Sequence, residues 1–203
     1  MPSLSVAVLS VALALPRPYC PPRVACDRTG QLEHLRRTAV AVASAAERAA
    51  LAGPWASAAP DLATRLWPGD APELAAALLT VAWCESRLSA RVQAGLCPLY
   101  GCGGPRPGLA HSQWQIESSP LVPAAQWLAI VGDAPVQLED AAWTAARVLA
   151  RQRAHCAPHA RAWAYPTLAG YATGNACAWG PARRRARMLW RVDDAVRRAL
   201  RSP

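Results

Sequence analysis

The apolar residues of this chain recur at helical spacing over most of its length, whereas the alternating pattern of strands is sparse. Residues 31–52 carry one apolar stripe that ends at a Gly-Pro pair, which predicts an amphipathic helix. Further helices are expected over residues 121–131, 137–154, 166–172 and 181–200. The chain is therefore predicted to be mainly α.

The most apolar of the predicted helices covers residues 72–88, with Asp70 as its N-cap. It is apolar nearly all round, which is typical of a helix in the core. Glu85 lies at its C-terminal end, beside Trp83 and Leu88. Apolar surroundings and the negative end of the helix dipole both favour a neutral carboxylic acid, which can serve as a general acid. The alternative is a helix that ends in a solvated Glu-Ser-Arg.

Three segments are expected along the chain, and the first is an apolar stretch at the N-terminus. Residues 1–16 are apolar, too short to span a bilayer comfortably, and similar to the hydrophobic core of a secretory signal, with a cleavage site at Ala12-Leu13-Ala14. No basic residue precedes Arg17, so the alternative is an apolar helix or strand that packs on the domain. Residues 17–60 are expected to form a linker and a helix, and residues 61–203 the main domain.

Composition and charge narrow the class of protein. A chain of 203 residues with 53% hydrophobic and 17% charged residues is globular and has the length of one domain. Its net charge of +9 suits an anionic partner, such as nucleic acid, a membrane surface or an acidic cell wall. Much of the excess charge lies in an Arg-rich segment, residues 183–201, for which a solvated terminal helix is the alternative. No nucleic-acid-binding motif is present, so no specific nucleic acid is expected.

The chain has seven cysteines, which is typical of proteins from an oxidising compartment. The expected pairs are Cys20–Cys26, Cys97–Cys102 and Cys156–Cys177. Cys84 is then left as a buried thiol beside Glu85. A competing interpretation is a zinc site formed by Cys97, Cys102, Cys156 and His159. Because these spacings fit no standard zinc finger, neither a metal nor a cofactor is expected.

Three short segments stand in a suggestive order: Glu85-Ser86-Arg87-Leu88, then Ser112-Gln113-Trp114-Gln115-Ile116, then Gly170-Tyr171-Ala172-Thr173-Gly174. They resemble the motifs of soluble lytic transglycosylases and goose-type lysozymes in the lysozyme-like superfamily. Members of that group read Glu-Ser-x-hydrophobic, Gly-Leu-Met-Gln-Ile and Ala-Tyr-Asn-x-Gly. The resemblance covers roughly residues 61–190. It implies a lysozyme-like α+β fold, with a central buried helix that ends at the catalytic glutamate and a small hairpin region.

The resemblance also implies roles for individual residues. Glu85 matches the catalytic acid, which protonates the glycosidic oxygen and then acts as a base. Ser86 matches the serine that helps to orient this glutamate and the substrate. Gln115 matches the glutamine that lines the sugar cleft, and Tyr171 matches the tyrosine whose hydroxyl lies near the catalytic carboxyl group.

The second motif supplies two more expected substrate-binding residues, Gln113 and Trp114. An indole can offer an apolar face to a sugar ring, although packing in the core is an equal alternative for Trp114. The chain departs from the family at three places: Ser112-Gln113 replaces Gly-Leu, Ala172 replaces Asn, and Ser89-Ala90 replaces Asn-Pro.

The predicted reaction is cleavage of the β-1,4 bond between N-acetylmuramic acid and N-acetylglucosamine in peptidoglycan, as the resemblance implies. Glycosidases usually need a second carboxylate, and none lies in a matching motif; Glu117, Glu139 and Asp140 are the candidates. A lytic transglycosylase needs none, because the C6 hydroxyl of the substrate closes a 1,6-anhydro ring. The alternatives are a hydrolase of the same bond, an inactive cell-wall-binding protein and a basic nucleic-acid-binding protein.

The expected partner is therefore the glycan strand of peptidoglycan, with contact to an anionic cell-wall or membrane surface. We expect a monomer that is secreted, periplasmic or cell-wall associated, which includes delivery by a phage as an endolysin.

Overall fold

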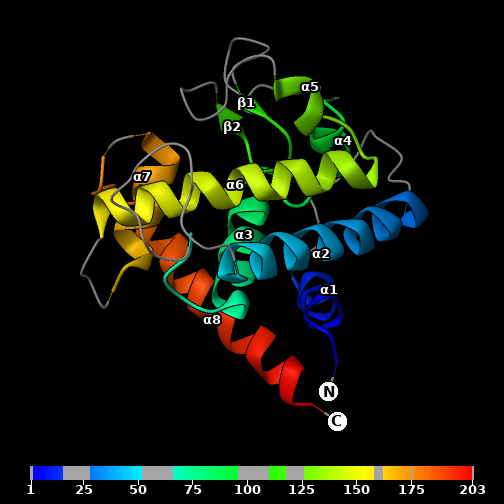
Figure 1. The fold of residues 1–203 in the computed structure, drawn as a ribbon, viewed down its shortest axis with the longest axis horizontal. Coiled ribbons are helices and arrows are strands. Elements are labelled where there is room, and N and C mark those ends of the chain that lie inside the picture. Colours follow the sequence, from blue (N-terminus) through cyan, green and yellow to red (C-terminus); the bar gives the residue numbers. More distant parts are fainter. Residues whose placement is uncertain are drawn as a thin grey trace.

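The computed structural model describes residues 2–15, 28–51, 66–95, 110–117, 126–157, 162–174 and 176–202. Its helices are α1 (Leu4–Ala14), α2 (Arg28–Leu51), α3 (Ala71–Ser86), α4 (Ala90–Gln93), α5 (Trp127–Ile130), α6 (Pro135–Cys156), α7 (Ala164–Thr173) and α8 (Ala182–Arg201) (Figure 1). Among these residues the only strands are β1 (Ala110–His111) and β2 (Ile116–Glu117), which pair antiparallel. The prediction of a mainly α chain is confirmed.

Helix α3 is the central element. Every residue from Leu74 to Ala82 is buried, and α3 contacts α1, α2, α6 and α8 (Figure 1). It begins as predicted, because the Asp70 carboxylate accepts a hydrogen bond of 3.0 Å from the backbone N–H of Glu73. It ends two residues earlier than predicted, because Arg87 adopts a left-handed conformation with φ 57° and its N–H bonds back to the Trp83 carbonyl oxygen.

The N-terminal apolar segment forms α1, which packs against α2, α3 and α8. Its buried residues are Leu4, Ala7, Val8, Val11 and Ala12. In this structure the segment is therefore an apolar helix that packs on the domain, which is the alternative to a secretory signal. None of the described helices combines the length and the apolar character needed to cross a membrane.

Helix α2 belongs to the same hydrophobic core as the helices that follow it. The residues of its predicted stripe that are buried are Leu35, Ala39, Val42, Ala46 and Ala49, whereas Leu32 is exposed. These side chains join one cluster with those of α3, α6 and α8. The expected boundary at residue 60 therefore does not separate two cores in the described part of the chain.

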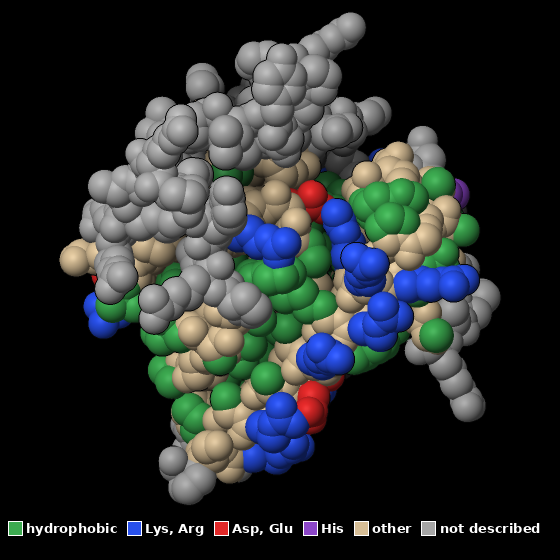
Figure 2. Space-filling model, turned by 180° about the vertical axis from the view of Figure 1, so that it is seen from behind, with side chains coloured by type: hydrophobic (Ala, Val, Ile, Leu, Met, Phe, Trp, Pro, Cys, Tyr) green, Lys and Arg blue, Asp and Glu red, His purple; other side chains and the backbone are tan. Residues whose placement is uncertain are grey.

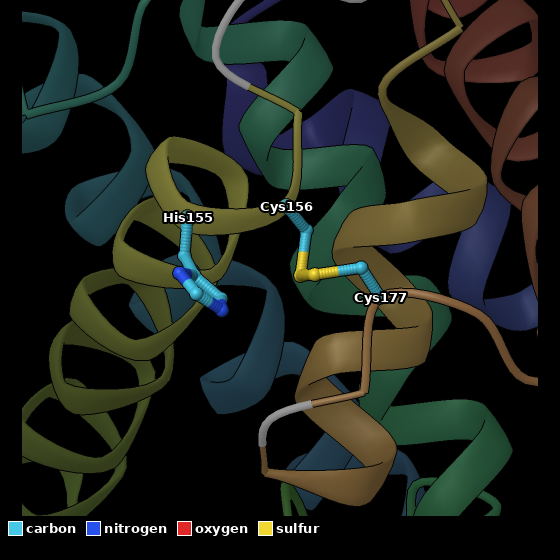
Figure 3. A group of neighbouring side chains, drawn as sticks. All are labelled: His155, Cys156 and Cys177. Carbon is cyan, nitrogen blue, oxygen red and sulfur yellow. A yellow bond between two sulfur atoms is a disulfide. The ribbon is translucent and has the colours of Figure 1, made fainter.

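The predicted Cys156–Cys177 disulfide is present and joins the end of α6 to the segment after α7 (Figure 3). The side chain of His155 lies beside it, and these three are the only group with metal-ligand spacing among the described residues. Because both sulfur atoms are bonded to each other, Cys156 is not a zinc ligand in this structure. Cys84 is a free thiol, as expected, but it is half-buried rather than buried. The pairs Cys20–Cys26 and Cys97–Cys102 lie outside the described residues.

A bidentate ion pair between Arg197 and Asp70 connects α8 to the start of α3. Both guanidinium NH₂ groups of Arg197 donate to the Asp70 carboxylate at 2.8 Å, and Arg197 Nε donates to Asp193 at 3.0 Å. These hydrogen bonds from Arg197 are the main reason that the pKa of Asp70 lies below its ordinary value of 3.8.

Removing the disulfide with Cys156→Ala and Cys177→Ala should lower the free energy of unfolding by about 3 kcal/mol, because the bond closes a loop of intermediate length. Urea denaturation measures the difference. Cys84→Ala, which breaks no bond, is the matched control and should have a smaller effect. Equal stability of the wild type and the double variant would contradict the prediction.

Asp70→Asn keeps a good N-cap and removes the charge that Arg197 contacts. A lowered pKa in the folded state means that the ionised carboxylate contributes stability above pH 3.8, and that this contribution is lost as the pH falls through the folded-state pKa. Urea denaturation at pH 6 should therefore separate the wild type from the variant, and the difference should shrink at acid pH. The control Asp194→Asn removes an exposed pair with Arg198 and should change little at either pH.

Candidate functional site

Glu85 lies in the last turn of α3, with 19% of its side chain exposed. Its carboxylate accepts a hydrogen bond from the guanidinium group of Arg185, which comes from α8 and is 16% exposed. The sequence placed Glu85 in apolar surroundings and gave no sign of this ion pair. Arg185 is one of several arginines in its segment, and only the packing of α8 on α3 selects it.

The backbone after Glu85 is fixed by a tight double turn. Arg87 and Leu88 both have positive φ, 57° and 56°, which is uncommon for residues other than glycine. The carbonyl oxygen of Leu88 accepts a hydrogen bond of 2.8 Å from the Gln31 side chain of α2, and Leu88 itself is buried. The C-terminal end of α3, and with it Glu85, is therefore supported by a second helix.

The Ser86 hydroxyl does not have the contact that the resemblance implies. Its hydroxyl is buried and donates a hydrogen bond of 2.8 Å to the Ala82 carbonyl oxygen, one turn back in α3. In this structure Ser86 stabilises the helix end and does not contact the Glu85 carboxylate.

The second motif forms the turn between β1 and β2. Ser112 and Gln115 have positive φ, 62° and 50°, and the Gln115 N–H donates to the Ser112 carbonyl oxygen at 3.1 Å. The Gln115 side chain folds back and donates to the same oxygen at 3.0 Å. Because Gln115 is only half-buried, it remains the member of this motif with side-chain surface open to a ligand.

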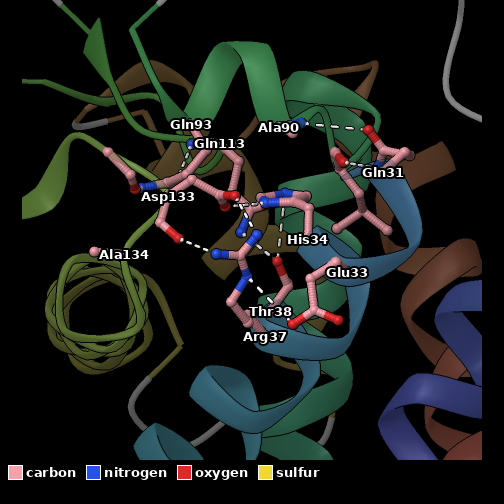
Figure 4. A network of polar contacts seen from close by, with 12 residues as sticks. Gln31, Glu33, His34, Arg37, Thr38, Ala90, Gln93, Gln113, Asp133 and Ala134 are labelled. Atoms are coloured by element: carbon pink, nitrogen blue, oxygen red, sulfur yellow. Dashed lines mark hydrogen bonds and ion pairs between the residues drawn. The ribbon is translucent and has the colours of Figure 1, made fainter. Parts of the chain in front are cut away.

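Gln113 does not face the site, contrary to its expected role in substrate binding. Its side chain is completely buried, donates to the Thr38 hydroxyl at 3.1 Å and lies 3.3 Å from His34 Nε2. His34 in turn contacts Asp133 through Nδ1 at 2.5 Å, and the Arg37 guanidinium group donates to the same carboxylate. Figure 4 shows His34 close to Gln113 and Asp133.

The backbone of the same turn has its own partner. The Gln113 N–H donates to the Gln93 side-chain oxygen at 3.0 Å, and the Gln93 amide group donates to the carbonyl oxygens of Ile130 and Gly132 (Figure 4). The turn is therefore fixed from α2, from α4 and from the segment after α5. The inner members of this network, His34, Thr38, Gln93 and Gln113, are buried and hydrogen-bonded, which makes the network a rigid support.

Trp114 also lies in the core. Its side chain has no exposed surface, and its indole N–H donates to the Leu78 carbonyl oxygen of α3 at 3.0 Å. The alternative of core packing is the one that the structure shows, so Trp114 offers no ring face to a ligand here. Its backbone oxygen nevertheless accepts a hydrogen bond of 2.8 Å from the Tyr171 hydroxyl of α7.

Tyr171 is the point at which the three motifs meet. Its hydroxyl bonds to the turn of the second motif, and the charge of Glu85 acts on it. Burial is the main reason that the pKa of Tyr171 is raised well above its ordinary value of 10.0, and the Glu85 carboxylate raises it further, against an opposing effect of Arg185. The phenol therefore stays protonated at neutral pH and can keep donating to Trp114.

Two guanidinium groups lie over indole rings near the C-terminal end of α3. The Arg87 guanidinium lies 3.8 Å from the centre of the Trp83 ring, and Arg185 lies 5.2 Å from the centre of the Trp179 ring. Burial raises the pKa of the neighbouring Cys84 thiol, with Arg185 acting in the opposite direction. Sequence reasoning missed Trp179 and Arg185, since neither belongs to a motif.

Among the described side chains, none of the candidate carboxylates lies next to Glu85 as a second catalytic group. Glu139 and Asp140 are exposed on α6, and Glu139 lies near Glu33 and Arg37 of α2 rather than with Tyr171. The side chain of Glu117 lies outside the described part of the chain. The charged groups that surround Glu85 in the described part are arginines.

Tyr171→Phe removes the hydroxyl that donates to Trp114 and should cost about 1 kcal/mol of stability without unfolding the protein. In an alkaline titration followed by phenolate absorbance, the change near pH 10 should be the same in the wild type and the variant, because Tyr171 ionises only at higher pH. Stability should fall as the pH rises above 10, since the folded state binds this proton more tightly. A smaller absorbance change near pH 10 in the variant would show that Tyr171 has an ordinary pKa.

Comparison of the chain with models of protein families, with curated proteins and with solved structures found no match in any of the three. Its function is therefore inferred from its own residues and their geometry.

Proposed function

We propose that this protein degrades peptidoglycan by cleaving the β-1,4 bond between N-acetylmuramic acid and N-acetylglucosamine, with Glu85 as general acid and base. One observation carries the proposal: Glu85, the turn of the second motif and Tyr171 are far apart in sequence and meet in one site. The three segments that resemble the motifs of lytic transglycosylases are thus also neighbours in space. A lysozyme-like α+β arrangement, with α3 as the central helix and β1–β2 as the hairpin, is part of the same proposal.

The proposed reaction begins with transfer of a proton from the Glu85 carboxylic acid to the glycosidic oxygen, as the bond to the leaving sugar breaks. The resulting Glu85 carboxylate is stabilised by Arg185, and their ion pair in this structure corresponds to that state of the cycle. The carboxylate then takes the proton from the C6 hydroxyl of the muramic acid as this oxygen bonds to C1. The product is a 1,6-anhydro sugar, and Glu85 is protonated again.

Tyr171 and the buried network have a positioning role in this proposal. The Tyr171 hydroxyl donates to the Trp114 carbonyl oxygen, and Gln113 attaches the other side of the turn to His34 and Thr38. Together they fix Gln115 relative to Glu85. Gln115 is the residue of the second motif proposed to contact the sugar, whereas Gln113 and Trp114 support it from inside.

Among the described side chains no second carboxylate is identified beside Glu85, which favours a lytic transglycosylase over a hydrolase. A hydrolase needs a group that activates water or forms a covalent intermediate, and the identified neighbours of Glu85 are Arg185 and Tyr171. The C6 hydroxyl of the substrate replaces that group in a transglycosylase.

We also propose that the protein acts as a monomer outside the cytoplasm, in the periplasm or at a cell wall, with the glycan strand as its partner. The Cys156–Cys177 disulfide supports this location, because such bonds persist mainly in oxidising compartments.

Glu85→Gln should lower the rate of peptidoglycan cleavage at least about 100-fold, because the amide cannot deliver the proton. Products of digestion of purified peptidoglycan are identified by mass spectrometry, and the transglycosylase reaction yields muropeptides one water lighter than hydrolysed ones. The matched control is Glu139→Gln, which removes an exposed carboxylate from α6 and should leave the rate unchanged.

Cleavage that survives Glu85→Gln would contradict the assignment of the acid. Products with ordinary reducing ends would show a hydrolase. No product from the wild type would shift the interpretation to a cell-wall-binding protein, or to a nucleic-acid-binding protein if the chain then binds DNA in a salt-dependent way.

A further inference from the structure

A groove of about 730 Å³ runs between α1 and α8 and is also lined by Trp83 of α3. Its floor is apolar and includes Val11 and Leu15 of α1 and Met188 and Val192 of α8. One edge is formed by arginines of α8. The groove therefore combines an apolar floor with a cationic rim.

The rim consists of Arg184, Arg187 and Arg191, which line the groove, follow one another at helical spacing and are exposed. Within the part of the chain that the structure describes, none of the three makes an ion pair. Two other arginines of α8 differ from these three, because Arg185 and Arg197 form ion pairs with carboxylates. Figure 2 shows a row of cationic side chains beside an apolar surface on one face of the molecule.

Helix α1 extends the apolar part of this face. It contains no charged residue, and Val6 and Leu13 are each 52% exposed. They lie four and three residues from Ser10, so they are beside this groove-lining residue on the surface of α1, at the edge of the groove rather than within it. An uncharged, partly exposed apolar helix thus lies next to a row of unpaired arginines.

We propose that this α1–α8 face binds the surface of an anionic lipid bilayer. Val6, Leu13 and the apolar groove would contact the boundary between head groups and acyl chains, and the three arginines would contact anionic head groups. Guanidinium groups suit this role because they bind phosphate oxygens through paired hydrogen bonds. The proposal is independent of cell-wall cleavage, since it uses neither Glu85 nor Tyr171.

Two other occupants fit the face less well. A second copy of the chain, related by a twofold axis, would bring one row of arginines against its equivalent in the partner, and like charges repel. A soluble polyanion would use the arginines and leave Val6 and Leu13 in water. A bilayer surface uses the charged and the apolar part together.

Sedimentation of the full-length protein with vesicles tests the proposal. We expect binding to vesicles of phosphatidylcholine mixed with phosphatidylglycerol, and little binding to phosphatidylcholine alone. The triple variant Arg184→Gln, Arg187→Gln, Arg191→Gln should bind about 100-fold more weakly at low salt, since each arginine near the surface contributes about a factor of five. The control Arg36→Gln, Arg48→Gln, Arg151→Gln removes the same charge from α2 and α6 and should bind nearly as well as the wild type.

A second pair of variants tests the apolar part. Val6→Ser with Leu13→Ser should weaken binding by about tenfold, because fewer apolar groups enter the interface. Val136→Ser, at an exposed apolar position of α6, should have no effect. Circular dichroism verifies that each variant is folded.

Three results would overturn the proposal. The first is no binding to anionic vesicles. The second is binding that is unchanged by Val6→Ser with Leu13→Ser and fully displaced by heparin, which would show general polyanion binding. The third is self-association in sedimentation that the triple arginine variant abolishes, which would make the face an interface between copies.

Discussion

The burial of the middle of α3, from Leu74 to Ala82, is the constraint on which the rest of this structure depends. A helix with apolar side chains on every face must be covered on every side, and α1, α2, α6 and α8 provide that cover. Because its middle is enclosed, its position is defined by packing along its length. Its last turn then leaves the core at a defined place, so Glu85 lies at the end of a helix that is held by packing.

Much of the polar chemistry near the site stabilises the structure rather than facing a ligand. Gln113 and Trp114 point inward, to the His34 network and to α3, and the turn they belong to contains two residues with positive φ. Such backbone conformations persist where surrounding contacts determine them. The carbonyl oxygen of Trp114 in this turn accepts the hydrogen bond from Tyr171, which connects α7 to the site. The disulfide connects the segment after α7 to the end of α6.

The arginines of α8 illustrate how one helix can serve several surfaces. Arg197 reaches Asp70 at the start of α3, Arg185 reaches Glu85 at its end, and a third set faces the groove beside α1. Their roles differ because successive helical positions point in different directions. The net charge of the chain is thus divided between internal ion pairs and an open cationic row, which are physically distinct uses of the same residue type.

The sequence by itself determined the elements whose signals are local. Periodicity predicted α2, α3, α6, α7 and α8, the capping rule identified Asp70, and the Cys156–Cys177 pair was anticipated. Only the tertiary structure decided that Arg185 pairs with Glu85, that Trp114 is buried and that residues 4–14 pack as a helix on the core. The physical reason is that periodicity and capping depend on neighbours within one or two turns, whereas ion pairs and burial depend on which distant helices meet.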